Sequence, residues 1–259
     1  MKNFIKRHSP YIYICIFAIQ FGYTEKGEDM AAEVKDNILT ISMPVHGIWI
    51  TPNTPGSKVP SHGTSDFGES YAIDFVMIND AKGIKKPYKS SIIKYIISGV
   101  PLSDFYGWGQ TVYSPTNGKI IAIENNIPER QIVNPFTDLQ YMRKATKEYI
   151  SFRKFPEKIA GNYVLLEISK SQYALLAHLV KGSIIVKPGE SVEIGQALGK
   201  LGHSGNSTMP HLHMQFMNSV DFNNAEGIPF KIREYEVIKD EKWQKVNNSI
   251  PTDKDIIRY

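Results

Sequence analysis

The chain has 259 residues, of which 42% are hydrophobic and 22% are charged, and its formal net charge is +4. This composition is typical of a globular protein with one large domain or two small ones. The charge excess is too small to indicate a partner nucleic acid, and no apolar run after the N-terminus reaches the 18 residues of a membrane span. A single cysteine, Cys15, excludes an intrachain disulfide framework and a cysteine-rich zinc site. A bound metal would therefore need histidine, aspartate or glutamate ligands.

Residues 1–29 are predicted to be a signal-like or anchor segment with a linker. Three basic residues within the first seven precede a short apolar run from Tyr11 to Ile19, which is the order of a secretory signal. We therefore expect the protein to be secreted or anchored outside the cytoplasm, with membrane contact only through this segment if it is uncleaved. The alternative is a start at Met30, which would give a cytoplasmic protein.

The next segments are predicted to alternate between strands and loops. Residues 30–44 form a linker and an N-terminal strand, and the main domain is expected to span residues 45–235. Residues 54–70 are rich in proline, glycine and serine and are predicted to form a loop. The stretch YAIDFVMI at 71–78 is predicted to be a strand buried on both faces, because both alternating faces are apolar.

The second half is predicted to contain one helical segment among short strands. Residues 79–110 indicate an irregular insertion with exposed aromatic side chains, and residues 111–124 indicate a hairpin that turns at Asn117-Gly118. Residues 128–160 are the best helix candidate. Short strands are then expected within 162–169, 172–180, 183–202 and 211–217, and residues 236–259 form a polar tail without periodicity.

Two histidines and one aspartate indicate a reactive site. His211 and His213 stand at i and i+2, so in a strand both imidazoles point to one face. Imidazole is a common metal ligand and general base, although an isolated pair is as often a satisfied strand edge. A carboxylate at Asp74 in a doubly buried strand needs a partner, which can be a metal or a lysine or arginine. His178 lies on an apolar strand, where a lone histidine is more often a core residue.

Four stretches resemble the lysostaphin/LytM-type zinc endopeptidases, a family that cuts peptidoglycan peptides. They are GQALGKLGHSGNSTMPHLHMQF, YALLAHL, VYSPTNGKIIAI and GNYVLLEI. The resemblance covers roughly residues 45–235. It implies a mainly β fold of the duplicated hybrid motif type, a compact antiparallel sheet or sandwich with a groove over the sheet. The helical segment would be one insertion into that fold.

The resemblance also implies the residues of the site. Its metal ligands correspond to His62, Asp74 and His213, and its catalytic histidines that bind no metal correspond to His178 and His211. Three nitrogen or oxygen ligands suit one catalytic Zn²⁺ per chain, with a fourth position open.

One departure from the family pattern leaves a choice of ligand. The family's first histidine and its aspartate stand four residues apart, a spacing that Asp66 satisfies, whereas Asp74 lies twelve residues after His62. We favour Asp74 because it lies in the family's strand context, Ile-Asp-Phe. Asp66 lies in a loop where an exposed carboxylate needs no partner.

The function implied is that of a zinc-dependent endopeptidase acting on peptidoglycan peptides, and we expect a monomer. Tyr106 and Trp108 are candidate substrate-binding residues on a groove wall that Phe105 and residues 128–160 also form, or these aromatic side chains pack on the core. His203 is interpreted as a surface turn residue and His46 as structural. The alternatives are an inactive scaffold or activator of the same fold, a metallohydrolase with a non-wall substrate, and a carrier or phosphotransfer domain.

Overall fold

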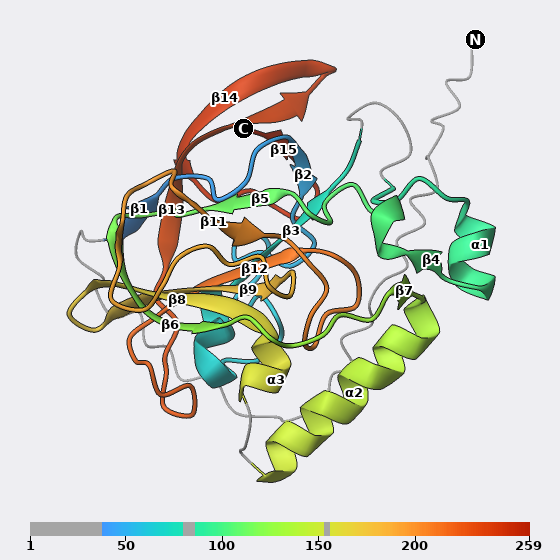
Figure 1. Cartoon of the computed structure of the whole chain (residues 1–259). Helices are drawn as coiled ribbons and strands as arrows, with labels where there is room; N and C mark the ends of the chain where they lie inside the picture. The colour runs from blue at the N-terminus through green and yellow to red at the C-terminus, as the bar shows by residue number, and fades with distance from the viewer. Residues whose placement is uncertain (1–37, 80–85, 153–155) are drawn as a thin grey trace, which may run out of the picture. The chain divides into compact units, whose positions relative to one another are not determined.

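The computed structural model describes residues 38–79, 86–152 and 156–259 (Figure 1). The predicted leader, residues 1–29, and the first part of the predicted linker lie outside the described residues. The strands are β1 Leu39–Ile41, β2 Ile48–Ile50, β3 Ile73–Met77, β4 Val100–Pro101, β5 Thr111–Tyr113, β6 Gly118–Glu124, β7 Ile132–Val133, β8 Asn162–Ser169, β9 Gln172–Leu179, β10 Ser191–Val192, β11 Ala197–Lys200, β12 Leu212–Met217, β13 Phe230–Lys239, β14 Lys242–Ser249 and β15 Ile256–Arg258. The helices are α1 Ile92–Ile97, α2 Pro135–Phe152 and α3 Pro156–Ala160, with 3-10 turns η1 Asp66–Tyr71 and η2 Leu102–Asp104.

A large sheet dominates residues 38–259 and confirms the prediction of a mainly β fold. Its eleven strands run in the order β1-β13-β15-β2-β3-β12-β9-β8-β6-β10, and β14 pairs with β13 outside this path. All its pairings are antiparallel except that of β1 with β13, so the sheet is mixed. Two further sheets have two strands each, β11 with β5 and β4 with β7. Within the described residues, no helix is both long enough and apolar enough to cross a membrane.

The centre of the sheet brings three sequence-distant strands side by side. β12 lies between β3 and β9, with His213 opposite Asp74 on one side and opposite Ala177 on the other. All five residues of β3 except Met77 are buried, as are all six of β12. The doubly buried strand predicted around Asp74 is therefore confirmed, and antiparallel pairing sets the two side chains next to each other.

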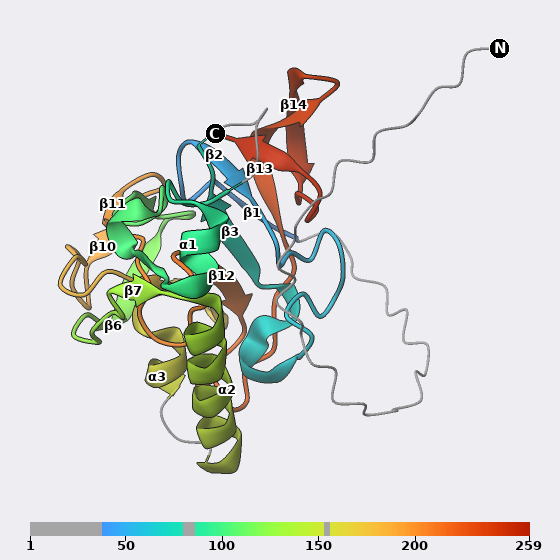
Figure 2. The same cartoon turned by 90° about the vertical axis from the view of Figure 1, so that its right-hand side faces the viewer.

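The predicted helical segment is confirmed as α2 and α3. Helix α2 begins where the sequence supplies a cap, because the Asn134 side-chain oxygen accepts hydrogen bonds from the backbone N–H groups of Phe136 and Thr137. Pro135 follows at the first helical position, where its missing N–H costs nothing. Figures 1 and 2 both show α2 near α1 and at the opposite end from β14.

The predicted hairpin at 111–124 is wrong in its pairing. Its two strands exist as β5 and β6, but β5 pairs with β11, whereas β6 pairs with β8 and β10. The reason lies in the connecting residues, because the backbone N–H of Ser114 donates to Gln196 and that of Ser42 donates to Pro115. The Asn117 side chain accepts from the Ile194 N–H. The turn is thus bonded to other segments instead of closing on itself.

Two further segments contain more regular structure than expected. The predicted polar tail, residues 236–259, contains the end of β13, all of β14 and β15, and β15 pairs with β2. The strand β14 is mostly exposed. Because neither of its faces is buried, its sequence does not alternate between apolar and polar residues. The predicted irregular insertion 79–110 contains α1, β4 and η2.

Candidate active site

The buried carboxylate of Asp74 lies at the centre of a cluster of histidines. Its Oδ2 is 3.0 Å from His62 Nε2, and its Oδ1 is 3.0 Å from His213 Nδ1 and 3.6 Å from His211 Nε2. The Asn53 side chain also donates to Oδ2 at 2.7 Å. One ligand atom each of His62, Asp74 and His213 lie within 4.8 Å of one another. Two imidazole nitrogens and one carboxylate oxygen are the donor set of a catalytic zinc site.

Outer hydrogen bonds direct the two ligand imidazoles. The Ser61 hydroxyl donates to the Glu69 carbonyl and so accepts from His62 Nδ1–H, 3.0 Å away. The Gln215 amide nitrogen donates to the Phe67 carbonyl, and its oxygen accepts from His213 Nε2–H at 2.9 Å. These bonds leave His62 Nε2 and His213 Nδ1 unprotonated when the rings are neutral, and both nitrogens face Asp74. The donor set therefore fits a divalent metal.

The predicted catalytic histidine His178 lies at an irregular point of β9. The pairing of β8 with β9 shifts register between Asn162 and Val164, so β9 has one extra residue there. His178 has a φ of 64° in the left-handed region, which costs a non-glycine residue about 1–3 kcal/mol. A bulge of this kind re-aims a side chain. The ring centre of His178 lies 4.7 Å from that of His211 and 5.9 Å from that of His213.

His178 and His211 are each held by a hydrogen bond from Nδ1 to a backbone carbonyl. His178 Nδ1–H donates to the Ser204 carbonyl at 2.9 Å, and His211 Nδ1–H donates to the Met209 carbonyl at 2.7 Å. In both neutral rings the Nε2 atom is therefore a free acceptor, and that of His211 faces Asp74. An unprotonated imidazole nitrogen beside a metal site can accept a proton from water.

Burial and the shared carboxylate set the charges of the cluster. Burial opposes ionisation of Asp74, but the positive charge that His62 and His211 carry when protonated and the hydrogen bond from His213 hold the pKa of its carboxyl well below its usual range. Burial alone would lower the pKa of His213, but the hydrogen bond and charge of Asp74 raise it to about 9. Burial lowers the pKa of both His178 and His211, so these two rings are neutral at pH 7.

The structure brings together five of the residues that the sequence singled out. The Asp74 carboxylate contacts His62, His211 and His213, and the ring of His178 lies against those of His211 and His213. Asp66, the alternative ligand, is exposed at the start of η1 and is not part of the metal-ligand group found in the described residues.

The aromatic residues of the predicted wall separate into two kinds. Phe105 is 3% exposed and packs with Tyr88 and Tyr95 in a second core cluster, so for this residue the alternative of core packing is confirmed. Tyr106 and Trp108 are half-buried. The Trp108 indole N–H donates to Glu129 at 3.1 Å. Their assignment to substrate binding stays a prediction.

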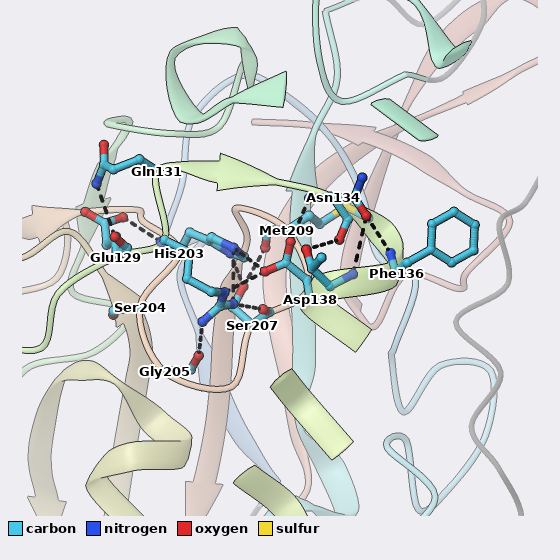
Figure 3. A network of polar contacts seen from close by, with 12 residues as sticks. Glu129, Gln131, Asn134, Phe136, Asp138, His203, Ser204, Gly205, Ser207 and Met209 are labelled. Atoms are coloured by element: carbon cyan, nitrogen blue, oxygen red, sulfur yellow. Dashed lines mark hydrogen bonds and ion pairs between the residues drawn. The ribbon is translucent and has the colours of Figure 1, made fainter. Parts of the chain in front are cut away.

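The two other histidines within the described residues lie in different environments. His203 is fully buried, so the expectation of a surface turn residue is wrong. It contacts Asp138, Arg130 and Ser207, none of which the sequence marked as special (Figure 3). The burial of Asp138 has no signal in the sequence, because a carboxylate in the first turn of a helix is ordinarily a solvated cap. His46 is exposed and stacks on Tyr259.

Comparison with known proteins matches part of the chain. Residues 145–226 match the family model described as peptidase family M23. The chain is 34% identical over 82 residues to peptidoglycan DD-endopeptidase ShyC of Vibrio cholerae, covering 29% of this chain and 18% of ShyC. It is 40% identical over 58 residues to peptidoglycan DD-endopeptidase ShyA of the same organism, covering 22% of this chain and 13% of ShyA. The aligned segments thus span less than a fifth of either relative.

Two solved structures are similar over most of the described domain. A zinc-containing peptidase from Vibrio cholerae aligns with a TM-score of 0.36 and 20% identity, covering 73% of this chain and 39% of that chain. The catalytic domain of lysostaphin from Staphylococcus simulans aligns with a TM-score of 0.34 and 18% identity, covering 70% and 88%. The family match at 145–226 contains His178, His211 and His213, whereas His62 and Asp74 precede it.

Proposed function

We propose that this chain, whose residues 145–226 match the model of peptidase family M23, is a zinc-dependent endopeptidase that hydrolyses amide bonds in peptidoglycan peptides. The observation that carries the proposal is the convergence of His62, Asp74 and His213, with donor atoms within 4.8 Å of one another. The bonds from Ser61 and Gln215 support it, because they turn the ligand nitrogens toward the shared carboxylate. The two relatives named as peptidoglycan DD-endopeptidases favour this substrate class.

His62, Asp74 and His213 would hold one zinc ion per chain. When bound, zinc supplies the Lewis acidity that makes water a nucleophile near neutral pH and polarises an amide carbonyl. The carboxylate of Asp74 supplies the negative charge of the site, and the two imidazoles supply neutral nitrogens. This donor set contains no thiolate and leaves room for a fourth position.

His178 and His211 would move the proton in this reaction. Each presents an unprotonated Nε2, because its Nδ1–H is bonded to a backbone carbonyl. One of them accepts the proton of the attacking water at Nε2 and thereby becomes a donor. That Nε2–H can then stabilise the oxyanion or protonate the leaving amine nitrogen. Their fixed carbonyl partners keep both rings in the orientation that this requires.

The substrate and setting of the reaction follow from the same proposal. A peptide in extended conformation would lie along a groove over the sheet, with Tyr106 and Trp108 on its wall. The protein would act as a monomer and outside the cytoplasm. The expectation of export depends on residues 1–29, which lie outside the described residues.

Metal content and wall hydrolysis, measured on the same samples, test the proposal. Elemental analysis should find one zinc per chain in the wild type and in Asp66→Ala, and both should release soluble peptides from purified peptidoglycan. Asp74→Ala should lose zinc and hydrolysis together. Zinc lost in Asp66→Ala but kept in Asp74→Ala would move the ligand into the loop. A wild type that binds no zinc under reconstituting conditions would favour a non-catalytic scaffold, and a zinc protein inactive on peptidoglycan but active on other peptides would change the substrate.

A further inference from the structure

A second buried carboxylate lies outside the candidate metal centre. Asp138, in the first turn of α2, is fully buried, and its Oδ1 accepts from Arg130 Nε at 2.6 Å and lies 3.2 Å from His203 Nε2. Its Oδ2 accepts from the backbone N–H of Asn134 at 2.7 Å. Figure 3 shows Asp138 beside His203 and Ser207. Nothing in the proposed hydrolysis uses these groups.

The second cluster reaches the active site through one hydroxyl. Ser207 Oγ lies 3.0 Å from His203 Nδ1 and 3.1 Å from His211 Nδ1. The same hydroxyl donates to the Met209 carbonyl at 2.6 Å, and that carbonyl is the acceptor of His211 Nδ1–H. A continuous chain of polar contacts therefore runs from helix α2 to Nδ1 of His211, the ring nitrogen that does not face Asp74. Every side chain in it except that of Arg130 is nearly or fully buried.

The guanidinium of Arg130 connects the segment 128–160 to the turn between β11 and β12. It donates through Nη1 to the Gly205 carbonyl at 3.0 Å and through Nη2 to the Ser207 carbonyl. The Glu129 carboxylate accepts from the His203 backbone N–H at 2.8 Å. The turn between β11 and β12 is irregular, so these contacts replace the ladder bonds that a strand would have.

We propose that Asp138, His203 and Ser207 are positioning residues for His211, and that the insertion 128–160 thereby sets the geometry of the active site. The inference rests on the proposed function, because it assigns His211 the role of proton acceptor. His211 precedes β12 and lies at the end of the irregular turn, so its ring depends on side-chain contacts for its orientation. Asp138 orients His203, His203 orients Ser207, and Ser207 with the Met209 carbonyl holds His211 Nδ1.

A double-mutant cycle on kcat separates positioning from stability. Asp138→Asn and Ser207→Ala should each lower kcat on a soluble peptidoglycan peptide by about 10- to 100-fold at unchanged KM, because small displacements of a catalytic group have effects of this size. The double variant should be no slower than the slower single variant, because both changes break one chain. Zinc content should remain one per chain in all three.

Ser114→Ala is the matched control for Ser207→Ala. Both serines are fully buried, and each donates to the carbonyl two residues later at 2.6 Å. Ser114→Ala should lower the melting temperature to a similar extent without changing kcat. The inference is overturned if Ser114→Ala reduces kcat equally, if Ser207→Ala and Asp138→Asn leave kcat unchanged, or if their effects simply multiply.

The imidazole nitrogen resonances of His211 provide a readout that does not need activity. In ¹⁵N-histidine-labelled protein, His211 should show a protonated Nδ1 and an unprotonated Nε2 in the wild type, and both signals should move in Asp138→Asn and Ser207→Ala but not in Ser114→Ala. Unchanged signals in the two variants would overturn the inference even in an active enzyme. A wild type without hydrolytic activity would instead remove the proposed function, and the resonances would still decide whether the chain of contacts orients the ring.

Discussion

Asp74 and Asp138 are both buried carboxylates in contact with histidine, yet their surroundings differ in the counter-charge. The ion pairs of Asp74 are with His62, His211 and His213, which carry charge only when protonated. Asp138 is paired with the permanent charge of Arg130 as well as with His203. A carboxylate balanced only by imidazoles can exchange their protons for a metal ion, whereas one balanced by a guanidinium is already neutralised. Only the first cluster is a metal-ligand group among the described residues.

The largest expected difference between the two clusters is in metal binding. Asp74→Asn should weaken zinc binding by more than about 1,000-fold, because the loss of an outer partner alone costs 10- to 100-fold and this change removes a ligand charge. Asp138→Asn should bind zinc as the wild type does. Titration against a chromophoric chelator measures both, and equal zinc affinities in the two variants would abolish the distinction.

The second expected effect is on folding stability. Asp138→Asn leaves the Arg130 guanidinium, which is only 25% exposed, without its carboxylate, and should lower the free energy of unfolding by about 3 kcal/mol. The matched control is Glu236→Gln, which removes a carboxylate from a pair with Arg258 at the surface. The control should leave the urea midpoint unchanged, since exposed pairs contribute little. An equal shift in both variants would show that burial of Asp138 has no special weight.

The third effect tests the outer contact of the metal cluster. Gln215→Leu removes the acceptor of His213 Nε2–H and should weaken zinc binding by about 10- to 100-fold. Gln215→Glu retains an acceptor oxygen and should bind zinc more tightly than the leucine variant. The same chelator competition measures both, and a leucine variant with wild-type affinity would show that Gln215 does not orient its ligand.

The smallest effect is a pH dependence that belongs to the second cluster. Burial lowers the pKa of His203 despite the nearby Asp138, and Arg130 and His211 lower it further. The unfolded chain therefore binds a proton below pH 6.5 that the folded chain does not, so stability falls as pH decreases from 7 toward 5. The loss is at most about 1.4 kcal/mol per pH unit.

The comparison that isolates this effect is the wild type against His203→Gln. Urea unfolding is measured at pH 7, 6 and 5 with a chelator present, so that zinc release does not contribute. His178 and His211 shift in the same direction but are present in both proteins. Asp138 has a lowered pKa, and its contribution is lost only below about pH 4. A wild type whose pH slope equals that of His203→Gln would contradict the assignment to His203.

The sequence predicted the elements whose burial has a regular pattern. The strand around Asp74, the strand of His178 and the strand of His213 are all rich in apolar residues, and each is found where it was expected. The spacing of His211 and His213 did not show which nitrogen of each ring faces Asp74. That depends on Gln215 and Met209, whose contacts arise only when distant segments meet.

The sequence could not predict features that depend on pairing or on compensated charge. The strands at 111–124 carried a hairpin signal, but their partners are distant strands later in the chain, β11 for β5 and β8 for β6. The burial of Asp138 contradicts the ordinary behaviour of aspartate in a first helical turn. It is possible because Arg130, in the segment before α2, and His203, in the turn between β11 and β12, both contact the carboxylate.

The guanidinium of Arg130 bonds to the Gly205 and Ser207 carbonyls, which belong to the turn before β12. A chimera in which residues 128–160 were exchanged for a short loop would leave both carbonyls without this donor. The insertion is therefore not a cassette that can be moved between homologous scaffolds on its own. Natural substitutions at Arg130 or Asp138 should be accompanied by changes at His203, and the two segments should diverge together.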